Sequence, residues 1–211
     1  MKIWTFSDTH GKHMQVRPPE GVDMAIFAGD AGTYRNPVLC EQDYRNFLTW
    51  FDSLDIKYKT MINGNHCTAF EQGLVKREDI PESITYLENE SVTIEGIKIY
   101  GSPQTPYFCD WAYNVVPEKI DEYWKMIDDD ADIIVTHGPP KNILDRCIDG
   151  YRAGCPKLLD RIKVIRPKYH IFGHIHEDGG KIENNETTQF INASVVNEDY
   201  HVVNDGIIVE Y

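Results

Sequence analysis

Residues 169–176 read Tyr169-His170-Ile171-Phe172-Gly173-His174-Ile175-His176, a short apolar run followed by a glycine and two histidines. The apolar part predicts a β-strand over residues 169–172, and the Gly-His-x-His part lies where that strand ends and a loop begins. Two histidines two residues apart are unusual as packing residues, because both titratable rings would lose water on one face of the strand. They are readily explained as ligands of a metal ion.

The same arrangement recurs four more times along the chain, each time directly after an apolar run. The four further clusters are Asp8-Thr9-His10, Gly29-Asp30, Gly64-Asn65-His66 and Thr136-His137-Gly138. In α/β sheets, ligands bind at the edge where strands end and loops begin. Oxygen and nitrogen donors delivered from five strand ends can surround a pair of divalent metals. The set therefore predicts a dinuclear metal site that hydrolyses phosphate esters.

Most of these clusters have an ordinary explanation when they are taken singly. Asp8 and His10 would point to one face of an extended backbone and offer donors suited to Mn²⁺, Fe or Zn²⁺, but Asp8 equally fits an Asx turn or a helix cap. Asp30 and Asn65 each fit a turn, and His137 fits a buried, hydrogen-bonded histidine at a strand end. The prediction of a metal site therefore rests on the order of all five clusters together.

Five of the eight histidines fall in these clusters. His66 follows Asn65 directly, and its imidazole can serve as a general acid toward a leaving group. We expect solvated or core positions for the remaining three, His13, His170 and His201.

Strands and helices alternate over the first two thirds of the chain, and paired strands follow. Strands are predicted over residues 3–6, 22–28, 57–62, 133–136 and 169–172, helices over 40–54, 117–127 and 155–165, a hairpin over 91–100 that turns at Glu95-Gly96, and alternating segments over 188–193 and 201–209. This order predicts an α/β fold in which two packed sheets are flanked by helices. No linker divides the chain, so residues 1–211 are expected to form one domain.

Composition limits the partners that the chain can have. With 41% hydrophobic residues in 211, the chain can bury a core, and its net charge of −13 disfavours binding of polymeric nucleic acid. A small phosphorylated substrate stays compatible, because bound cations reverse the local field. The five irregularly spaced cysteines are expected to be reduced thiols, and no segment resembles a signal peptide or a membrane span. We therefore expect a cytoplasmic protein without a membrane partner; the sequence predicts no oligomeric state.

The ordered set D-x-H, G-D, G-N-H, H and G-H-x-H, which spans residues 8–176, resembles the calcineurin-like metallophosphoesterase superfamily. Further stretches look like its metallophosphoesterase-domain (MPPED) branch, which contains reported cyclic-nucleotide phosphodiesterases: Gly101-Ser102-Pro103-Gln104-Thr105-Pro106-Tyr107-Phe108, Thr136-His137-Gly138-Pro139-Pro140, Arg166-Pro167-Lys168 and Ile191-Asn192-Ala193-Ser194. The resemblance implies the four-layer metallophosphoesterase fold, with two packed mixed β-sheets flanked by helices.

The resemblance also implies a division of labour within the site. Asp8, His10 and His176 would hold one metal, Asn65, His137 and His174 the other, with Asp30 bridging both and His66 as the catalytic imidazole. One position departs from the family pattern, because Cys67 stands where the family commonly has Glu or Asp after G-N-H. A thiol is a weaker partner than a carboxylate for a protonated histidine, which bears on the pH optimum and the activity.

The expected function is metal-dependent hydrolysis of small phosphate esters. A hydroxide that bridges two divalent ions would attack phosphorus, with Mn²⁺ expected and Fe or Zn²⁺ as alternatives. Two such ions, two carboxylates and one hydroxide leave about +1, which mildly favours a diester monoanion such as a cyclic nucleotide over a monoester dianion. The alternatives are a phosphomonoesterase on the same site and a non-catalytic scaffold. All eight site positions are filled, which argues against the scaffold.

An aromatic stretch between Pro103 and Tyr113 has two readings. It is either a hydrophobic plug under a long loop or a wall against which a nucleobase stacks, with Tyr107 as a candidate substrate contact. The MPPED resemblance alone suggests Asn192 and Ser194 as further contacts to a nucleotide-like substrate.

Overall fold

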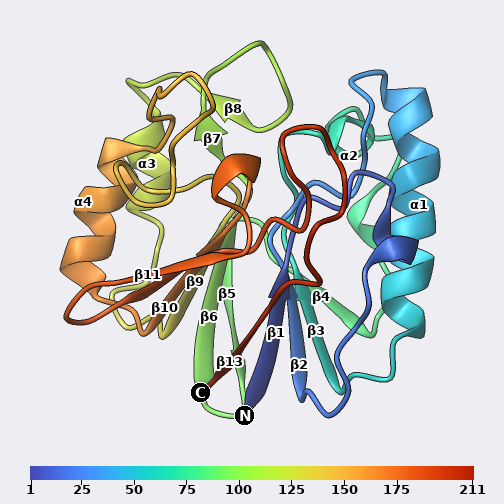
Figure 1. The fold of residues 1–211 in the computed structure, drawn as a ribbon, viewed down its shortest axis with the longest axis horizontal. Coiled ribbons are helices and arrows are strands. Elements are labelled where there is room, and N and C mark those ends of the chain that lie inside the picture. Colours follow the sequence, from blue (N-terminus) through green and yellow to red (C-terminus); the bar gives the residue numbers. More distant parts are fainter.

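Two β-sheets pack face to face in the computed structural model, which describes residues 1–211 (Figure 1). The first sheet has five strands in the order β13-β1-β2-β3-β4. Its strands are β1 (Lys2–Phe6), β2 (Met24–Phe27), β3 (Tyr58–Met61), β4 (Ile84–Tyr86) and β13 (Ile207–Glu210). Strands β1 to β4 run parallel, and β13 pairs antiparallel with β1.

The second sheet has six strands in the order β11-β12-β10-β9-β6-β5. Its strands are β5 (Glu90–Ile94), β6 (Ile97–Ser102), β9 (Ile133–Thr136), β10 (Tyr169–Phe172), β11 (Lys181–Asn184) and β12 (Gln189–Asn192). The four inner strands run parallel, and the edge strands β5 and β11 are antiparallel to their neighbours. The predicted hairpin is confirmed, because Glu95 and Gly96 turn between β5 and β6 with positive φ angles of 50° and 82°.

Helices cover the outer face of each sheet. In Figure 1, α1 (Pro37–Ser53) and α2 (Thr68–Glu71) lie on the side of the first sheet, and α3 (Ile120–Trp124) and α4 (Pro156–Ile165) on the side of the second. Three single-turn 3₁₀ helices complete the regular structure: η1 (His13–Gln15), η2 (Arg77–Asp79) and η3 (His176–Asp178). The predicted arrangement of two mixed sheets between helical layers is confirmed. None of the helices combines the length and the apolar character needed to cross a membrane.

Alternation along the strands separates three apolar cores. In β1, Ile3 points between the two sheets while Trp4 packs in the core under α1. In β10, Ile171 joins the core between the sheets and Phe172 the core under α3 and α4. Because strands of both sheets share the central core, the two sheets are fixed relative to each other, and their loops meet at a common edge.

Two predicted elements are shorter in the structure. The helix expected over residues 117–127 is regular only over 120–124, since the amide of Lys119 bonds to the carbonyl of Val116 in a tighter turn. The strand expected over residues 201–209 begins at Ile207, because Tyr200 takes a left-handed backbone (φ 62°) and the following residues form a loop. The short pair β7 (Thr105–Pro106) and β8 (Asn114–Val115) brackets a loop between β6 and α3.

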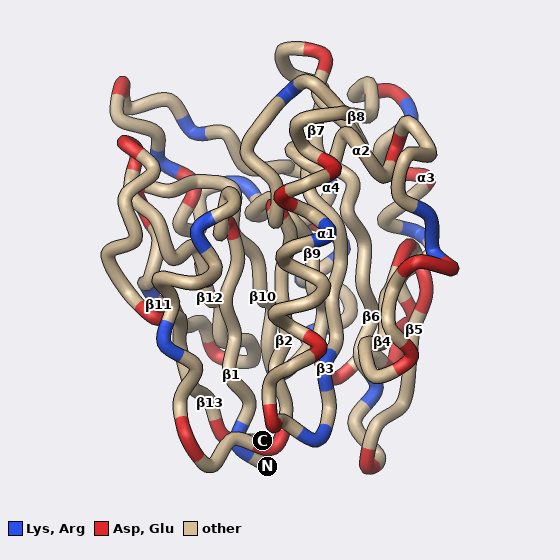
Figure 2. The backbone as a smooth tube through the Cα atoms, turned by 90° about the vertical axis from the view of Figure 1, so that its right-hand side faces the viewer, with Lys and Arg blue, Asp and Glu red and all other residues tan.

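Charged residues are dispersed over the surface. Figure 2 shows Lys and Arg positions scattered among Asp and Glu positions, with no continuous basic stripe in that view. Acidic residues outnumber basic ones, which gives the chain its formal net charge of −13.

Candidate metal centre

All eight predicted site residues lie in loops that follow five parallel strands. The loop after β1 carries Asp8 and His10, and the loop after β2 carries Asp30. The remaining loops, after β3, β9 and β10, carry Asn65, His66, His137, His174 and His176. These strands belong to both sheets, and their carboxyl ends meet at the upper edge in Figure 1. The structure therefore brings every one of the eight residues to one place.

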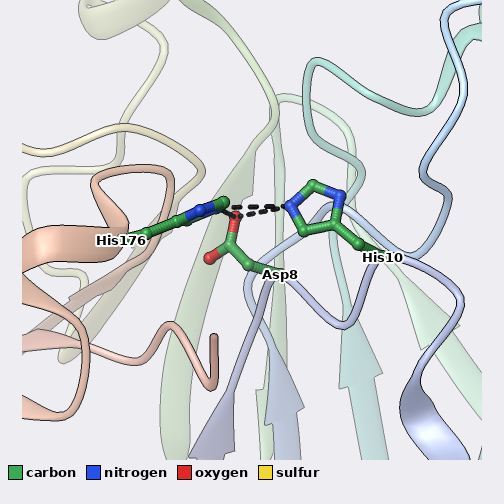
Figure 3. Close-up of side chains that lie close together, drawn as sticks. All are labelled: Asp8, His10 and His176. Atoms are coloured by element: carbon green, nitrogen blue, oxygen red, sulfur yellow. Dashed lines mark hydrogen bonds and ion pairs between the residues drawn. The ribbon is translucent and has the colours of Figure 1, made fainter. Parts of the chain in front are cut away.

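Asp8, His10 and His176 form the first group of donors (Figure 3). The Nε2 atom of His176 lies 3.5 Å from Asp8 Oδ1, and His10 Nε2 lies 3.9 Å from the same oxygen. The two Nε2 atoms are 3.3 Å apart. All three donor atoms thus point at one another.

The tautomer of His10 makes this group suited to a cation. His10 Nδ1 lies 2.9 Å from the carbonyl oxygen of Gly32, and because a carbonyl only accepts, Nδ1 carries the proton. In the neutral ring Nε2 then presents a lone pair to His176 and Asp8. A divalent ion with oxygen and nitrogen ligands fits this convergence of acceptors.

Asp30, His137 and His174 form the second group, and Asn65 contacts it. His137 Nε2 lies 3.2 Å from Asp30 Oδ2 and 2.8 Å from Asn65 Oδ1. His137 Nδ1 donates to the carbonyl of Ala28 at 2.9 Å, so in the neutral ring Nε2 is an acceptor that faces two oxygen acceptors. This arrangement leaves a cation as the natural partner of all three atoms.

Asp30 connects the two groups. Its Oδ2 lies 3.2 Å from His137 and 3.9 Å from His10, and its Oδ1 accepts from the backbone amide of His66 at 2.7 Å. A carboxylate with one oxygen between two donor groups occupies the position that a bridging ligand requires.

Burial and neighbouring charges set the protonation of the site. Burial alone would raise the pKa of Asp8 and Asp30, but the hydrogen bond and charge of His176 lower the pKa of Asp8, and the charge of His137 lowers that of Asp30. Burial would lower the pKa of His137, yet the charge and hydrogen bond of Asp30 and the charge of Asp8 together outweigh it and raise the value to about 9. For His174, burial lowers the pKa to about 3. A proton on His137 thus balances the carboxylates, and a metal ion can take its place.

Two glycines make the close approach of these loops possible. A Cβ atom at Gly64 would lie 2.4 Å from Asp30 Oδ1 and 2.6 Å from His137 Cε1. At Gly173 it would lie 2.1 Å from Ser7 Oγ and 2.2 Å from Asp8 Oδ2. The glycines of the G-N-H and G-H-x-H motifs are therefore required for space.

The expectation that Asp8 and His10 share one face of an extended backbone is wrong. Asp8 (φ 57°) and His10 (φ 43°) are both left-handed, and a turn brings their side chains together. His174 (φ 70°) is also left-handed, and His176 begins the 3₁₀ helix η3. His174 and His176 consequently leave the strand in different directions and join different donor groups.

His66 lies beside both donor groups and forms a third group of close donor atoms with His10 and Asp30. A ring nitrogen of His66 lies within 4.8 Å of donor atoms of His10 and Asp30. Its Nδ1 donates to the carbonyl of Thr33 at 2.8 Å, which leaves Nε2 for other partners. Cys67 is fully buried with its Sγ 3.3 Å from the amide of Gly64, and burial, together with the charge of Asp30, raises the pKa of its thiol. The thiol therefore stays neutral and supplies no charge to His66.

A cavity of about 450 Å³ opens over the two groups. Its wall includes Tyr107, Phe108 and Trp111, which is where the alternative of an aromatic wall predicts them. Tyr113 instead packs against the core under α1. The lining contains Glu177 and Glu198 but neither Lys nor Arg.

Asn192 and Ser194 lie away from this cavity. Both are fully buried, and Asn192 Nδ2 donates to the carbonyl of Ile175 at 2.8 Å while its Oδ1 accepts from the amide of Ser194. Their position makes them supports of the loop that carries His174 and His176. It does not favour the expected contact with substrate.

The structure adds residues that the sequence analysis did not identify. Ser7 Oγ donates to Asp8 Oδ2 at 2.5 Å, and Tyr151 and Tyr200 line the cavity. The Tyr200 ring lies edge-on to His10 with 4.7 Å between ring centres. Only Ser7, next to Asp8, carried a local signal; the two tyrosines come from distant loops. His13 and His170 are buried and His201 is exposed, all three outside the site as expected.

Comparisons with known proteins agree with this geometry. A family model described as calcineurin-like phosphoesterase matches residues 1–178. Metallophosphoesterase domain-containing protein 1 of Homo sapiens is 34% identical over 230 residues, which cover 97% of this chain and 69% of the human protein. A UPF0046 protein of Caenorhabditis elegans is 34% identical over 224 residues, which cover 99% of this chain and 74% of the nematode protein.

Solved structures share the fold at low sequence identity. Phosphopantetheinyl hydrolase from Mycobacterium tuberculosis superimposes with a TM-score of 0.61 at 13% identity, covering 94% of this chain and 90% of its own. Another crystal structure reaches a TM-score of 0.72 at 14% identity, covering 94% and 91%. At such identities the likeness concerns the fold alone.

Proposed function

Because the chain belongs to the calcineurin-like phosphoesterase family, we propose that it is a dimetal phosphodiesterase acting on cyclic nucleotides or related small diesters. One observation carries the proposal: two groups of donors, joined by Asp30, converge beneath a cavity of about 450 Å³. The opposed Nε2 atoms of His10 and His176, 3.3 Å apart, support a cation in the first group.

The proposed ligand sets follow the two groups. Asp8, His10 and His176 would hold one ion, and Asn65, His137 and His174 the other, with Asp30 shared. Divalent ions bound there supply activated water and positive charge at the phosphoryl oxygens. The mixed oxygen and nitrogen donors suit Mn²⁺, with Fe and Zn²⁺ as alternatives.

His66 is the proposed proton donor to the leaving oxygen. Its Nδ1 proton is held by the carbonyl of Thr33, so the other nitrogen, Nε2, is the one available to a substrate in the cavity. In the doubly protonated ring Nε2 also carries a proton; its transfer neutralises the alkoxide as the phosphorus–oxygen bond breaks and leaves the neutral ring protonated on Nδ1, and solvent restores the Nε2 proton afterwards. Replacing His66 by Ala should slow turnover and leave the metal content nearly unchanged.

Charge balance supports a diester over a monoester. Once the attacking oxygen has lost its proton, two divalent ions and the carboxylates of Asp8 and Asp30 leave about +1. The cavity offers no Lys or Arg for a second negative charge, and Glu177 and Glu198 add negative charge to its wall. A monoanionic diester therefore suits the cavity better than a dianionic monoester.

The aromatic wall supports a substrate with a flat apolar part. Tyr107 is 53% exposed and lines the cavity beside Phe108 and Trp111. The rings of Tyr107 and Phe108 can stack on a nucleobase. We include Tyr107 in the proposal as a substrate contact.

A substrate panel tests the proposal. The protein is assayed with Mn²⁺ on 2′,3′- and 3′,5′-cyclic nucleotides, on the matching mononucleotides, and on a nitrophenyl diester and monoester. We expect turnover of the diesters to exceed that of the monoesters, and His66→Ala to reduce it. Faster monoester hydrolysis would make the protein a phosphomonoesterase, and no turnover of any ester would support a non-catalytic scaffold.

A further inference from the structure

We propose that Trp111 is a positioning residue that holds the His66 ring in its working orientation. The proposal rests on the proposed function, in which His66 gives a proton to the leaving oxygen. Trp111 itself transfers no proton and would act only through His66.

The two rings stack in the cavity wall. Their centres are 4.1 Å apart and their planes differ by 28°. The hydrogen bond from His66 Nδ1 to the carbonyl of Thr33 fixes one edge of the imidazole but leaves it free to swing about that bond. Contact with the face of the indole removes that freedom, because an offset stack prefers nearly parallel planes.

Three polar contacts tie the Trp111 loop to its surroundings. The amide of Ala112 donates to the carbonyl of Asn65 at 3.2 Å, and Asn63 Nδ2 donates to the hydroxyl of Tyr113 at 3.0 Å. Arg35 donates to the carbonyl of Asp110 at 2.8 Å, and its guanidinium lies 5.3 Å from the centre of the Trp111 ring. The Trp111 loop is thus bonded to the turn that carries His66 on one side of the stacked pair and to Arg35 on the other.

The backbone of this loop is strained. Cys109, Asp110 and Tyr113 all take left-handed conformations, with φ angles of 48°, 53° and 56°. Side chains other than glycine rarely adopt this region, and such residues persist where the surroundings determine them and where a function depends on them. Trp111, between these residues, stacks on His66.

The residue that follows His66 cannot perform the same task. Cys67 is fully buried, and its sulfur accepts a hydrogen bond from the amide of Gly64 at 3.3 Å. A carboxylate at this point could orient the imidazole, whereas the thiol is bonded elsewhere. On the cavity side, the indole of Trp111 is the ring that stacks on the imidazole.

A comparison of two leaving groups tests the proposal. Methyl 4-nitrophenyl phosphate releases a stable anion that needs no proton, whereas methyl phenyl phosphate releases a more basic one. With Mn²⁺, we expect Trp111→Ala to lower kcat for the phenyl ester roughly tenfold or more and for the nitrophenyl ester less than about twofold. KM should change equally for the two esters, since their shapes are similar.

Three further variants separate positioning from general damage. Trp111→Phe keeps a flat face and should restore kcat for the phenyl ester to within about threefold of the unmodified protein. The double variant His66→Ala, Trp111→Ala should be no slower than His66→Ala alone, because Trp111 acts only through His66. Tyr34→Ala removes an aromatic ring that is 48% exposed and outside the cavity wall, and should change neither ester.

The outcomes distinguish this proposal from the proposed function. Equal losses of kcat for both esters, no loss for either, or a further loss in the double variant would overturn the role of Trp111 while leaving the phosphodiesterase intact. If His66→Ala showed no dependence on the leaving group, its role as proton donor would fall and the role of Trp111 with it. If the unmodified protein hydrolysed neither ester, the proposed function itself would be contradicted.

Discussion

Hydrogen bonds to backbone carbonyls fix the histidines of the site one by one. His10, His66 and His137 each donate from Nδ1 to a carbonyl, of Gly32, Thr33 and Ala28 respectively. Each bond fixes the tautomer and turns Nε2 toward the centre of the site. Backbone carbonyls thus orient the histidine rings of the site. The residue types of the sequence do not reveal these hydrogen bonds.

Asp30 and Asp8 should differ in how many metal ions depend on them. Asp30 contacts both donor groups, whereas Asp8 belongs to the first group only. We expect Asp30→Asn to lower the affinity for both ions, by about 10- to 100-fold or more, and Asp8→Asn to weaken one of them. Metal analysis after dialysis should give Mn²⁺ contents that fall from the unmodified protein to Asp8→Asn and then to Asp30→Asn. An Asp30→Asn protein that kept the full metal content would contradict the shared role of Asp30.

Strand-end turns are the elements on which the site depends. Gly64 does not take a left-handed backbone, so its requirement is one of space alone: a Cβ would lie 2.4 Å from Asp30 Oδ1. A turn of this kind explains why a glycine precedes Asn65 and His66 in the motif.

Gly64→Ala should therefore abolish metal binding while Gly73→Ala does not. Gly73 has a φ of +73° with nothing within 4 Å of its Cβ position, so alanine there costs only about 1–2 kcal/mol of backbone strain. The free energy of unfolding and the metal content are measured for both variants. A Gly64→Ala protein with normal metal content would show that the turn relaxes, and the spatial argument would fail.

The sequence contains strong signals for the strands but no signals for the contacts between distant loops. The apolar runs of β1, β2, β3, β9 and β10 are found where predicted, and with them all eight site residues. The left-handed backbone of His174 was not predicted; it accompanies a hydrogen bond from the His174 amide to Asp8 in a distant loop. Trp111 and Tyr200 reach the site from loops whose path is set by hydrogen bonds to other segments. Such long-range contacts leave no periodic signal in the sequence.

At the scale of the whole molecule, both sheets must be in place for the site to exist. The first sheet supplies Asp8, Asp30 and Asn65, and the second supplies His137 and His174. The central apolar core holds the two sheets together. We therefore propose that residues 1–211 act as one domain, since each of the two donor groups joined by Asp30 takes residues from both sheets.

A buried histidine outside the site makes the stability of the molecule depend on pH. His170 is fully buried in β10, bonded to Thr136 Oγ1 at 2.9 Å, and burial lowers its pKa to about 3 from the model-peptide value of 6.5. Between these pH values the unfolded chain binds a proton that the folded chain does not, so the free energy of unfolding falls as the pH drops from about 6.5 toward 3. The loss is on the order of 5 kcal/mol at most.

Urea unfolding at a series of pH values, on the unmodified protein and on His170→Gln, measures this contribution. The glutamine keeps a donor for Thr136 and cannot titrate, so its free energy of unfolding should fall less steeply below pH 6.5. Identical pH profiles for the two proteins would contradict the assignment to His170.

We propose that two metal ions, bound by one set of loops, make this chain a phosphodiesterase. The direct measurement is hydrolysis of a nitrophenyl diester by metal-free protein as Mn²⁺ is added in known equivalents. We predict that the rate rises from near zero and saturates at about two equivalents per chain, as expected for a two-metal site. Hydrolysis that is independent of Mn²⁺, or absent at every Mn²⁺ concentration, would contradict the proposed two-metal phosphodiesterase.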